Sequence, residues 1–362
     1  MDEVCTKRSG REILREIADQ VPAIEPRWNE RALRHLDNLT KPIGSLGRLE
    51  EIAARLSGIQ QKEVLDCKNK TIFTLAADHG VTEERVSAYP KAVTGQMVRN
   101  FLSGGAAINV LCRQFGIEVV VVDIGVDGKL DLAPGLVDRK VSMGTRNMAR
   151  GPAMEESELV RALHVGFELA ADAAERGRTL IGTGEMGIGN TTVASAITAV
   201  LTGRPAPQVT GMGTGLDSPG VERKIAVIER AIAVNHPNPS DAFDILEKVG
   251  GLEIAGLTGL ILGAAARRLA VVVDGFISTA AAALACTIQP RVGDFVFVAH
   301  RSSEPGHGAL LELIEQRPLL DLEMRLGEGT GSALAMAVIE SAAKLFNEMA
   351  TFSSARVSGA VS

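Results

Sequence analysis

Short apolar runs rich in β-branched residues alternate with longer helical segments from about residue 66 onward in this 362-residue chain. Strands joined through helices run parallel, because a crossover connection brings the chain back to the same end of the sheet. The runs are apolar almost without a break, as expected for strands covered on both faces. We therefore predict an α/β fold with a parallel sheet and flanking helices, and strands at residues 71–77, 118–124, 179–182, 270–273 and 295–299.

The sequence predicts only helices at both ends of the chain, without the alternation of strands and helices seen in the middle. The first sixty residues show helical periodicity, and residues 327–352 form one long helical pattern rich in Ala and Met. We expect these segments to pack together. The predicted division is a small helical domain from residues 1–65 and 327–362, and a large α/β domain from residues 66–326 that carries the glycine-rich loops.

Charge and aromatic content argue against a nucleic-acid partner. Lys and Arg total 38 against 44 Asp and Glu, a net charge of −6, and aromatic residues make up 3% of the chain. Nucleic-acid surfaces usually need a basic patch, and single-strand binding needs stacking platforms. The most apolar stretch, residues 255–285, is interrupted by Arg267, Arg268 and Asp274, and the N-terminus lacks the apolar core of a secretory signal. We expect a cytoplasmic protein that does not span a membrane.

Polar and glycine residues follow the predicted strands directly. In an open parallel sheet the carboxyl ends of the strands meet at one edge, where ligands bind. Asp78 and His79 could carry out acid–base or hydroxyl-binding work there, although an Asp that merely caps the next turn explains them equally well. The candidates at this edge are Asp78, His79, Asp274, Ser302, Ser303 and Glu304.

The segment most indicative of a binding site is GTGEMGIGNTT at residues 182–192. It lies between a predicted strand and a predicted helix that starts near Thr192. Free backbone N–H groups at a helix N-terminus bind anions, and glycines let a phosphate approach closely. A dinucleotide site would need an acidic residue about 20 positions later, yet none lies between Glu185 and Asp217, and a P-loop would need a Lys. A tight turn without a ligand remains an alternative.

Two more glycine loops, GMGTGLD at 211–217 and GEGTG at 327–331, favour a binding function. Glu185 and Glu328 stand among these glycines. A carboxylate there suits taking a proton, binding a ribose hydroxyl or facing a cationic centre, and a solvated loop charge is the alternative. His300, Glu304 and His307 have a spacing that a metal site could use, but Pro305 and Gly306 interrupt a helix that would align them, so we expect no metal.

Five motifs follow one another along the chain in an order that is typical of one family: KPIGSLGRL at 41–49, ADHGV at 77–81, GEMGIGNTT at 184–192, DGF at 274–276 and RLGEGTG at 325–331. Together they closely resemble the nicotinate-nucleotide:dimethylbenzimidazole phosphoribosyltransferase family of the cobalamin lower-ligand pathway. The likeness runs from about residue 22 to residue 352. It implies a homodimer with a Rossmann-like large domain, no cofactor, and transfer of phosphoribose from nicotinate mononucleotide to 5,6-dimethylbenzimidazole, giving α-ribazole 5′-phosphate and nicotinate.

The resemblance also implies roles for individual residues. Glu328 would be the general base, with Glu185 as a second catalytic or ribose-binding group. Phosphate and ribose would be held by Gly184, Gly187, Gly189, Asn190, Thr191, Thr192, Gly211, Gly213, Thr214 and Gly215. The base would be bound by Tyr89, Gln96, Met97 and Leu326.

The chemistry of this reaction fits these residue types. The leaving pyridinium needs no protonation, and no pyrophosphate departs, so no Mg²⁺ clamp is required. Carboxylates can stabilise an oxocarbenium-like ribose, and one of them can take the proton of the attacking base. The same transfer to another benzimidazole, a purine or a phenolic acceptor stays open, as does a non-catalytic nucleotide-binding protein. A metal-dependent hydrolase and a dehydrogenase are weaker alternatives.

Overall fold

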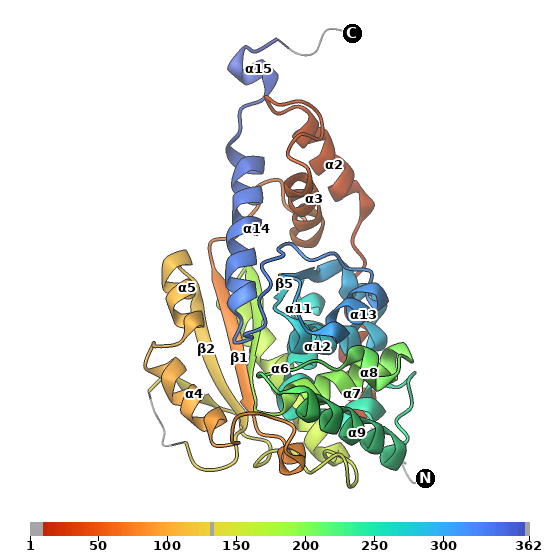
Figure 1. Ribbon diagram of the computed structural model, residues 1–362. Helices are drawn as coiled ribbons and strands as arrows, with labels where there is room; N and C mark the ends of the chain where they lie inside the picture. The colour runs from red at the N-terminus through yellow and green to blue at the C-terminus, as the bar shows by residue number, and fades with distance from the viewer. Residues whose placement is uncertain (1–9, 131–133, 359–362) are drawn as a thin grey trace, which may run out of the picture.

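The computed structural model describes residues 10–130 and 134–358, and its centre is a six-stranded parallel sheet of order β3-β2-β1-β4-β5-β6 (Figure 1). Parallel pairing throughout confirms the predicted α/β class. The strands are β1 Lys70–Ala77, β2 Glu118–Gly125, β3 Leu136–Asp138, β4 Leu180–Met186, β5 Ala270–Val273 and β6 Val296–Val298.

The strand order reverses next to β1. From β1 the chain builds outward through β2 and β3, and it then returns to add β4, β5 and β6 on the other side. The crossovers leaving β1 and β4 therefore diverge, and a crevice opens at the carboxyl ends of these two strands. The glycine segment at residues 184–192 begins at this point.

Three details of the strand prediction were wrong. β4 continues to Met186, so Gly184 and Glu185 lie inside a strand rather than after it. Both pair with β1, opposite Thr74 and Leu75. The edge strand β3 was missed, and the last strand is shorter than residues 295–299.

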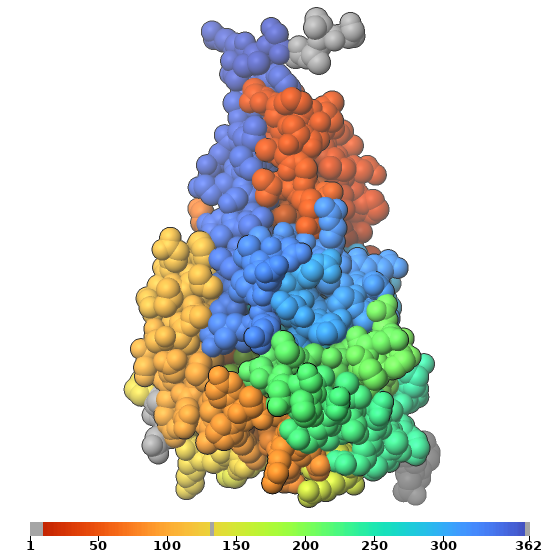
Figure 2. Space-filling model, in the orientation of Figure 1, coloured from red at the N-terminus to blue at the C-terminus, as the bar shows by residue number. Residues whose placement is uncertain are grey.

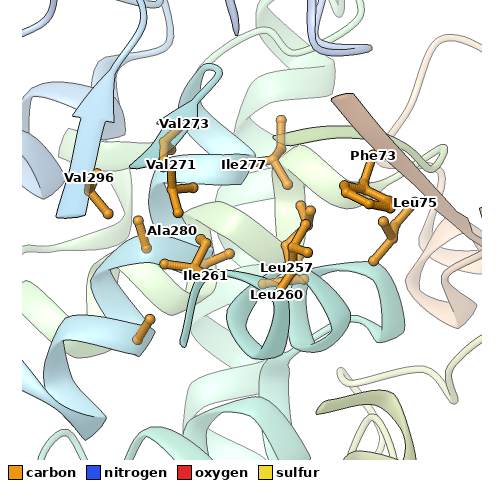
Figure 3. Packing of buried hydrophobic residues seen from close by; sticks show 14 of the residues in the cluster. Phe73, Leu75, Leu257, Leu260, Ile261, Val271, Val273, Ile277, Ala280 and Val296 are labelled. Carbon is orange, nitrogen blue, oxygen red and sulfur yellow. The ribbon is translucent and has the colours of Figure 1, made fainter. Parts of the chain in front are cut away.

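Helices cover both faces of the sheet. On one face α11 (Leu252–Ala266) packs against Leu75 and Ile124. Figure 3 shows Leu257, Leu260 and Ile261 of this helix among side chains of β1, β5 and β6. On the other face Met336 and Ser332 of α14 (Thr330–Glu348) contact Gly182 of β4. The helices before β4 are α1 Gly10–Ala18, α2 Pro26–Asp37, α3 Arg48–Gln60, η1 Gly80–Glu84, α4 Val93–Leu102, α5 Ala107–Phe115 and α6 Glu156–Glu175.

The remaining helices complete both layers. They are α7 Asn190–Thr202, α8 Ala206–Val209, α9 Ser218–Asn235, α10 Ala242–Val249, α11 Leu252–Ala266, α12 Phe276–Ile288, η2 Pro290–Phe295, α13 Pro305–Leu313, α14 Thr330–Glu348 and α15 Phe352–Ala355. Within residues 10–130 and 134–358, no helix has the length and apolar character needed to cross a bilayer.

Segments from the two ends of the chain lie side by side (Figures 1 and 2). Helix α3 packs against both α2 and α14, and Leu39 forms an antiparallel bridge with Thr351. The buried Lys41–Glu50 ion pair, 2.8 Å between Nζ and Oε1, supports the turn before α3. Helix α1 packs against α6 and α11 instead. The division into two domains stays a prediction, and residues 1–9 and 359–362 of its small domain lie outside the described residues.

Glycines allow α6 and α11 to approach unusually closely. A Cβ atom at Gly166 of α6 would overlap the carbonyl oxygen of Gly256, and one at Gly259 of α11 would overlap the carbonyl oxygen of Leu163. Neither neighbour is a flexible side-chain end, so a methyl group can be accommodated only by moving a helix backbone.

We therefore expect Gly166→Ala to lower the free energy of unfolding by about 1–3 kcal/mol, as overpacking typically does. Urea titration followed by circular dichroism measures this change. Gly308→Ala is the matched control, because Gly308 also lies in a helix but has open space at its Cβ position. The control should leave stability equal or slightly higher, since Ala favours helices. Equal effects of both substitutions would contradict the close-approach argument.

Candidate active site

A cavity of about 420 Å³ opens at the carboxyl edge of the sheet. Its walls come from the segments after β1, β4, β5 and β6, from α4, from the loop before α9 and from the turn before α14. The predicted site residues that line it are Tyr89, Met97, Glu185, Gly187, Asn190, Thr191, Gly213, Thr214, Ser302, Glu304, Leu326 and Glu328. The structure thus brings both glutamates and all three glycine loops to one place.

Other predicted site residues do not line this cavity. Gln96 is exposed on α4, and Ser303 is exposed with its hydroxyl donating to the Glu323 carbonyl oxygen at 3.0 Å. Gly184 lies inside β4, where a Cβ would overlap the carbonyl oxygen of Glu328. The rest lie behind or beside the lining residues: Asp78, His79, Gly189, Thr192, Gly211, Gly215 and Asp274.

Glu328 is held in a left-handed backbone conformation, with a φ of 65°. Such a conformation costs energy outside glycine and persists only where the surroundings enforce it. Asp274 accepts the Gly329 N–H at 3.1 Å and the Ser332 N–H at 3.0 Å, and the Thr74 hydroxyl donates to the Glu328 carbonyl oxygen at 3.0 Å. Contacts from β5 and β1 therefore fix the turn that presents this glutamate.

The carboxylate of Glu328 faces the cavity but is only 6% exposed. Its Oε2 accepts the Ile108 N–H at 3.4 Å. Burial raises the pKa of Glu328, and Asp274 raises it further, against that hydrogen bond. A higher pKa makes the carboxylate a better proton acceptor near neutral pH.

Glu185 lies at the end of β4 and is also 6% exposed. Its Oε2 accepts a hydrogen bond from the Asn190 side chain at the start of α7, and a Cβ at Gly327 would overlap its Oε1. Burial first, then the nearby Asp274 and Glu253 carboxylates, raise the pKa of Glu185 to about 8. The alternative of solvated loop charges is therefore wrong for both glutamates.

This raised pKa predicts a loss of stability with increasing pH. In the folded protein Glu185 keeps its proton up to a pKa of about 8, whereas the ordinary value is 4.5. Between these values the folded state binds more protons than the unfolded chain, so the free energy of unfolding falls as pH rises. Glu185→Gln removes this contribution.

The midpoint of thermal unfolding of E185Q, relative to the unmodified protein, should therefore rise between about pH 5 and about pH 8. Differential scanning calorimetry across this range measures the difference. A difference that stays constant with pH would show that Glu185 is already ionised in the folded protein.

One end of the cavity is suited to an anion. Lys224 of α9 is fully buried, and its Nζ donates to the Thr191 Oγ1 at 2.9 Å and to the Gly211 carbonyl oxygen at 3.2 Å. Burial lowers the pKa of Lys224 to about 8, although Glu304 counteracts this. The N-terminus of α7 lies alongside. Thr191 at this N-terminus lines the cavity, and Lys224 lies behind it, outside the lining. The Asn190 and Thr192 N–H groups already donate to the Gly187 and Gly189 carbonyl oxygens. The positive end of the helix dipole, with a lysine behind it, favours a bound anion such as a phosphate.

Arg325 lies on the rim of this end, and its Nη1 donates to the Gly213 carbonyl oxygen at 2.8 Å. The Gly213 N–H in turn donates to the Glu304 Oε1 at 3.0 Å. The sequence analysis did not assign a role to Lys224. The sequence did contain a sign that Lys224 is buried. Its spacing places it on the same face of α9 as the buried residues Val227, Ile228 and Ala231.

Much of the cavity lining is apolar. Tyr89 and Leu326, 54% and 57% exposed, stand at its mouth, and Met97 lies deeper. The sequence analysis missed most of this apolar lining, which also includes Val93, Met186, Ile188, Phe276 and Ile277. Mostly apolar walls with a few directed polar groups are usual for small-molecule sites.

The histidines near β6 have structural partners. The His307 Nδ1 accepts the Ser302 N–H at 2.8 Å, so its Nε2 carries the proton and donates to the Thr279 Oγ1 at 3.0 Å. Burial lowers the pKa of His307 to about 3, which keeps the ring neutral. Pro305 begins α13 rather than interrupting a helix, so that part of the sequence argument was wrong. Among the described residues, no three His, Cys, Asp or Glu side chains are grouped to hold a metal ion.

Asp78 and His79 are buried beneath the cavity. Asp78 accepts the Asp127 N–H at 2.8 Å rather than capping the turn that follows it, so the capping alternative was wrong. The His79 Nε2 and the Glu253 Oε1 are 2.8 Å apart, and both side chains are fully buried. Neither Asp78 nor His79 reaches the cavity directly.

Comparison with known proteins gives one consistent result. A family model described as phosphoribosyltransferase matches residues 21–357. A protein of Geobacter sulfurreducens, named nicotinate-nucleotide–dimethylbenzimidazole phosphoribosyltransferase, is 55% identical over 95% of this chain and 98% of its own length. One of the same name from Chloroflexus aggregans is 54% identical over 90% of this chain and 93% of its own. A crystal structure with that name from Thermus thermophilus superposes with a TM-score of 0.88 at 45% identity, covering 93% of this chain and all of that one.

Proposed function

The chain belongs to the phosphoribosyltransferase family whose model it matches over residues 21–357, and we propose that it transfers phosphoribose from nicotinate mononucleotide to 5,6-dimethylbenzimidazole. Relatives at 51–55% identity carry the name of this activity. The observation that supports the proposal is that two buried carboxylates, Glu185 and Glu328, line one cavity together with the N-terminus of α7 and many apolar side chains. The products are α-ribazole 5′-phosphate and nicotinate, for assembly of the cobalamin nucleotide loop.

The two ends of the cavity suit the two substrates. The phosphate and ribose of the nucleotide occupy the part of the cavity next to the N-terminus of α7 and the loop around Gly213, where the positive end of the helix dipole and the ammonium group of Lys224 behind Thr191 offset the negative charge. The apolar bicyclic acceptor lies against Met97 and Phe276. The reacting ribose carbon C1′ is then located between them, next to the carboxylates.

The reaction is a displacement at C1′. One acceptor nitrogen forms a bond to C1′ from the face opposite nicotinate, while the bond from C1′ to the pyridinium nitrogen breaks and nicotinate leaves with the electron pair. This attack inverts the sugar from β to α. The proton on the other acceptor nitrogen becomes acidic as the ring gains positive charge, and Glu328 takes it. Glu185, when ionised, stabilises the oxocarbenium-like ribose.

Several features beyond the reaction are part of the same proposal. The family resemblance favours a homodimer, a small domain of N- and C-terminal helices and a cytoplasmic location. Size-exclusion chromatography with light scattering measures the oligomeric state, for which twice the chain mass of 38.1 kDa is expected.

Product analysis tests the proposed function. The purified protein is incubated with nicotinate mononucleotide and dimethylbenzimidazole in EDTA, and the products are identified by chromatography and mass spectrometry. Stoichiometric nicotinate and ribazole phosphate are expected. Transfer only to a purine or phenol from an acceptor panel would favour the alternative acceptor, and nucleotide binding without any transfer would favour a non-catalytic protein. Activity that is lost in EDTA would point to a metal-dependent reaction.

A further inference from the structure

Thr94 links helix α4 to the glycine turn before α7. It belongs to α4, whose residues Val93 and Met97 line the cavity, yet Thr94 itself is fully buried and turned away from the lining. Helix α4 contacts β1, β2 and β4, so the Thr94 side chain is packed at the carboxyl ends of the central strands.

The Thr94 hydroxyl binds the glycine turn on the nucleotide side. Its Oγ1 accepts the Ile188 N–H at 3.1 Å. Ile188 lies between Gly187 and Gly189, just before α7, and both Gly187 and Ile188 line the cavity. Helix α4, which supports the acceptor, is therefore hydrogen-bonded directly to the turn that precedes the anion site.

The carboxyl of Asp78 lies beneath this link. Because the Thr94 oxygen accepts the Ile188 N–H, its single proton is free for an acceptor. Burial raises the pKa of Asp78, and the Asp127 N–H and then the Thr94 hydroxyl oppose that rise. The hydrogen bond that fixes the Thr94 hydroxyl is therefore the one from the backbone N–H of Ile188, in the turn after β4.

We propose that Thr94 is a positioning residue that couples the acceptor wall to the nucleotide turn, so that binding of one substrate prepares the site for the other. The inference rests on the proposed function. A shift of α4 on acceptor binding is passed through one buried hydrogen bond to residues 187–189, and nucleotide binding to that turn is passed back by the same bond. Such coupling is necessarily reciprocal.

Two substitutions at this position separate the hydroxyl from the shape of the side chain. Thr94→Val keeps the shape and leaves the Ile188 N–H without a partner, whereas Thr94→Ser keeps the hydroxyl. The matched control is Thr258→Val on α11. Thr258 is also fully buried, but its hydroxyl donates only to the carbonyl oxygens of Ile254 at 2.8 Å and Ala281 at 3.3 Å.

The measurement is initial-rate kinetics with both substrates varied, which gives the factor by which one substrate changes the KM of the other. T94V should lower kcat/KM for both substrates about tenfold, as expected for one buried donor left unpaired, and reduce this factor to one. T94S and T258V should keep the factor of the unmodified protein. If T94V does not fold, T94A is measured with the same expectations.

A T94V protein that retains the full factor, or a T94S protein as defective as T94V, would overturn the role of the hydroxyl. So would an unmodified protein in which each KM is independent of the other substrate. Transfer by the unmodified protein in the same assay tests the proposed function separately, so an active enzyme without coupling contradicts only the inference about Thr94.

Discussion

Replacing Glu328 with Gln is expected to lower kcat by about 10²–10⁴-fold, the usual contribution of a general base. Glutamine keeps the size of the side chain and can still accept the Ile108 N–H, but it cannot take a proton from the attacking acceptor. Because both substrates still find their sites, the KM values should change little. Steady-state rates of nicotinate release, with product identified at the end point, measure the effect.

The matched control is Glu323→Gln. Glu323 is also a glutamate in the left-handed conformation, with a φ of 55°, but it is exposed and does not line the cavity. E323Q should retain the kcat of the unmodified protein. If E328Q turned over at a near-normal rate, the proton would have to leave by another route, and the assignment of Glu328 would be wrong.

The second large effect is expected from Lys224→Met, which should raise the KM for the nucleotide about 10–100-fold. A hydrogen bond to a charged group contributes about 1.5–3 kcal/mol, and methionine keeps the apolar stem of the side chain while removing the ammonium group. The KM for the acceptor should change much less, because the Lys224 ammonium group binds Thr191 and Gly211 and none of the apolar lining residues. Kinetics with each substrate varied in turn separate the two effects.

Lys70→Met provides the comparison for burial alone. Lys70 is likewise buried and pairs with Glu340, but it lies at the start of β1, at the opposite end of the strands from the cavity. Both variants should lose stability, and only K224M should lose nucleotide affinity. If K224M lost stability but kept its nucleotide KM, Lys224 would be a structural residue with no role in binding phosphate.

The fold was predictable where the pattern was long and uniform. Four apolar runs gave β1, β2, β4 and β5 with correct direction, because strands buried on both faces leave a continuous signal. β3 was missed because three residues at a sheet edge, Leu136–Asp138, have no such signal. β4 was ended too early because Gly184 and Glu185 resemble a turn, and only their pairing with β1 shows otherwise.

The site was predictable where chemistry is local in sequence. The glycine loops gave Glu185, Asn190 and Glu328, all of which line the cavity. What sequence could not show is tertiary: Asp274 holds the Glu328 turn across the sheet, and Lys224 reaches the anion site from a helix in a different part of the chain. The roles assigned to individual residues stay predictions until the variants are measured.

The most direct test of the central claim is the configuration at C1′ of the product, determined by NMR of the anomeric proton after reaction of the unmodified protein with nicotinate mononucleotide and dimethylbenzimidazole. A displacement in this cavity, with the acceptor attacking from the face opposite nicotinate, predicts the α-anomer and one nicotinate released per product. A β-anomer would require either two successive displacements or attack from the same face. That result, or the absence of any ribosylated base, would contradict the account.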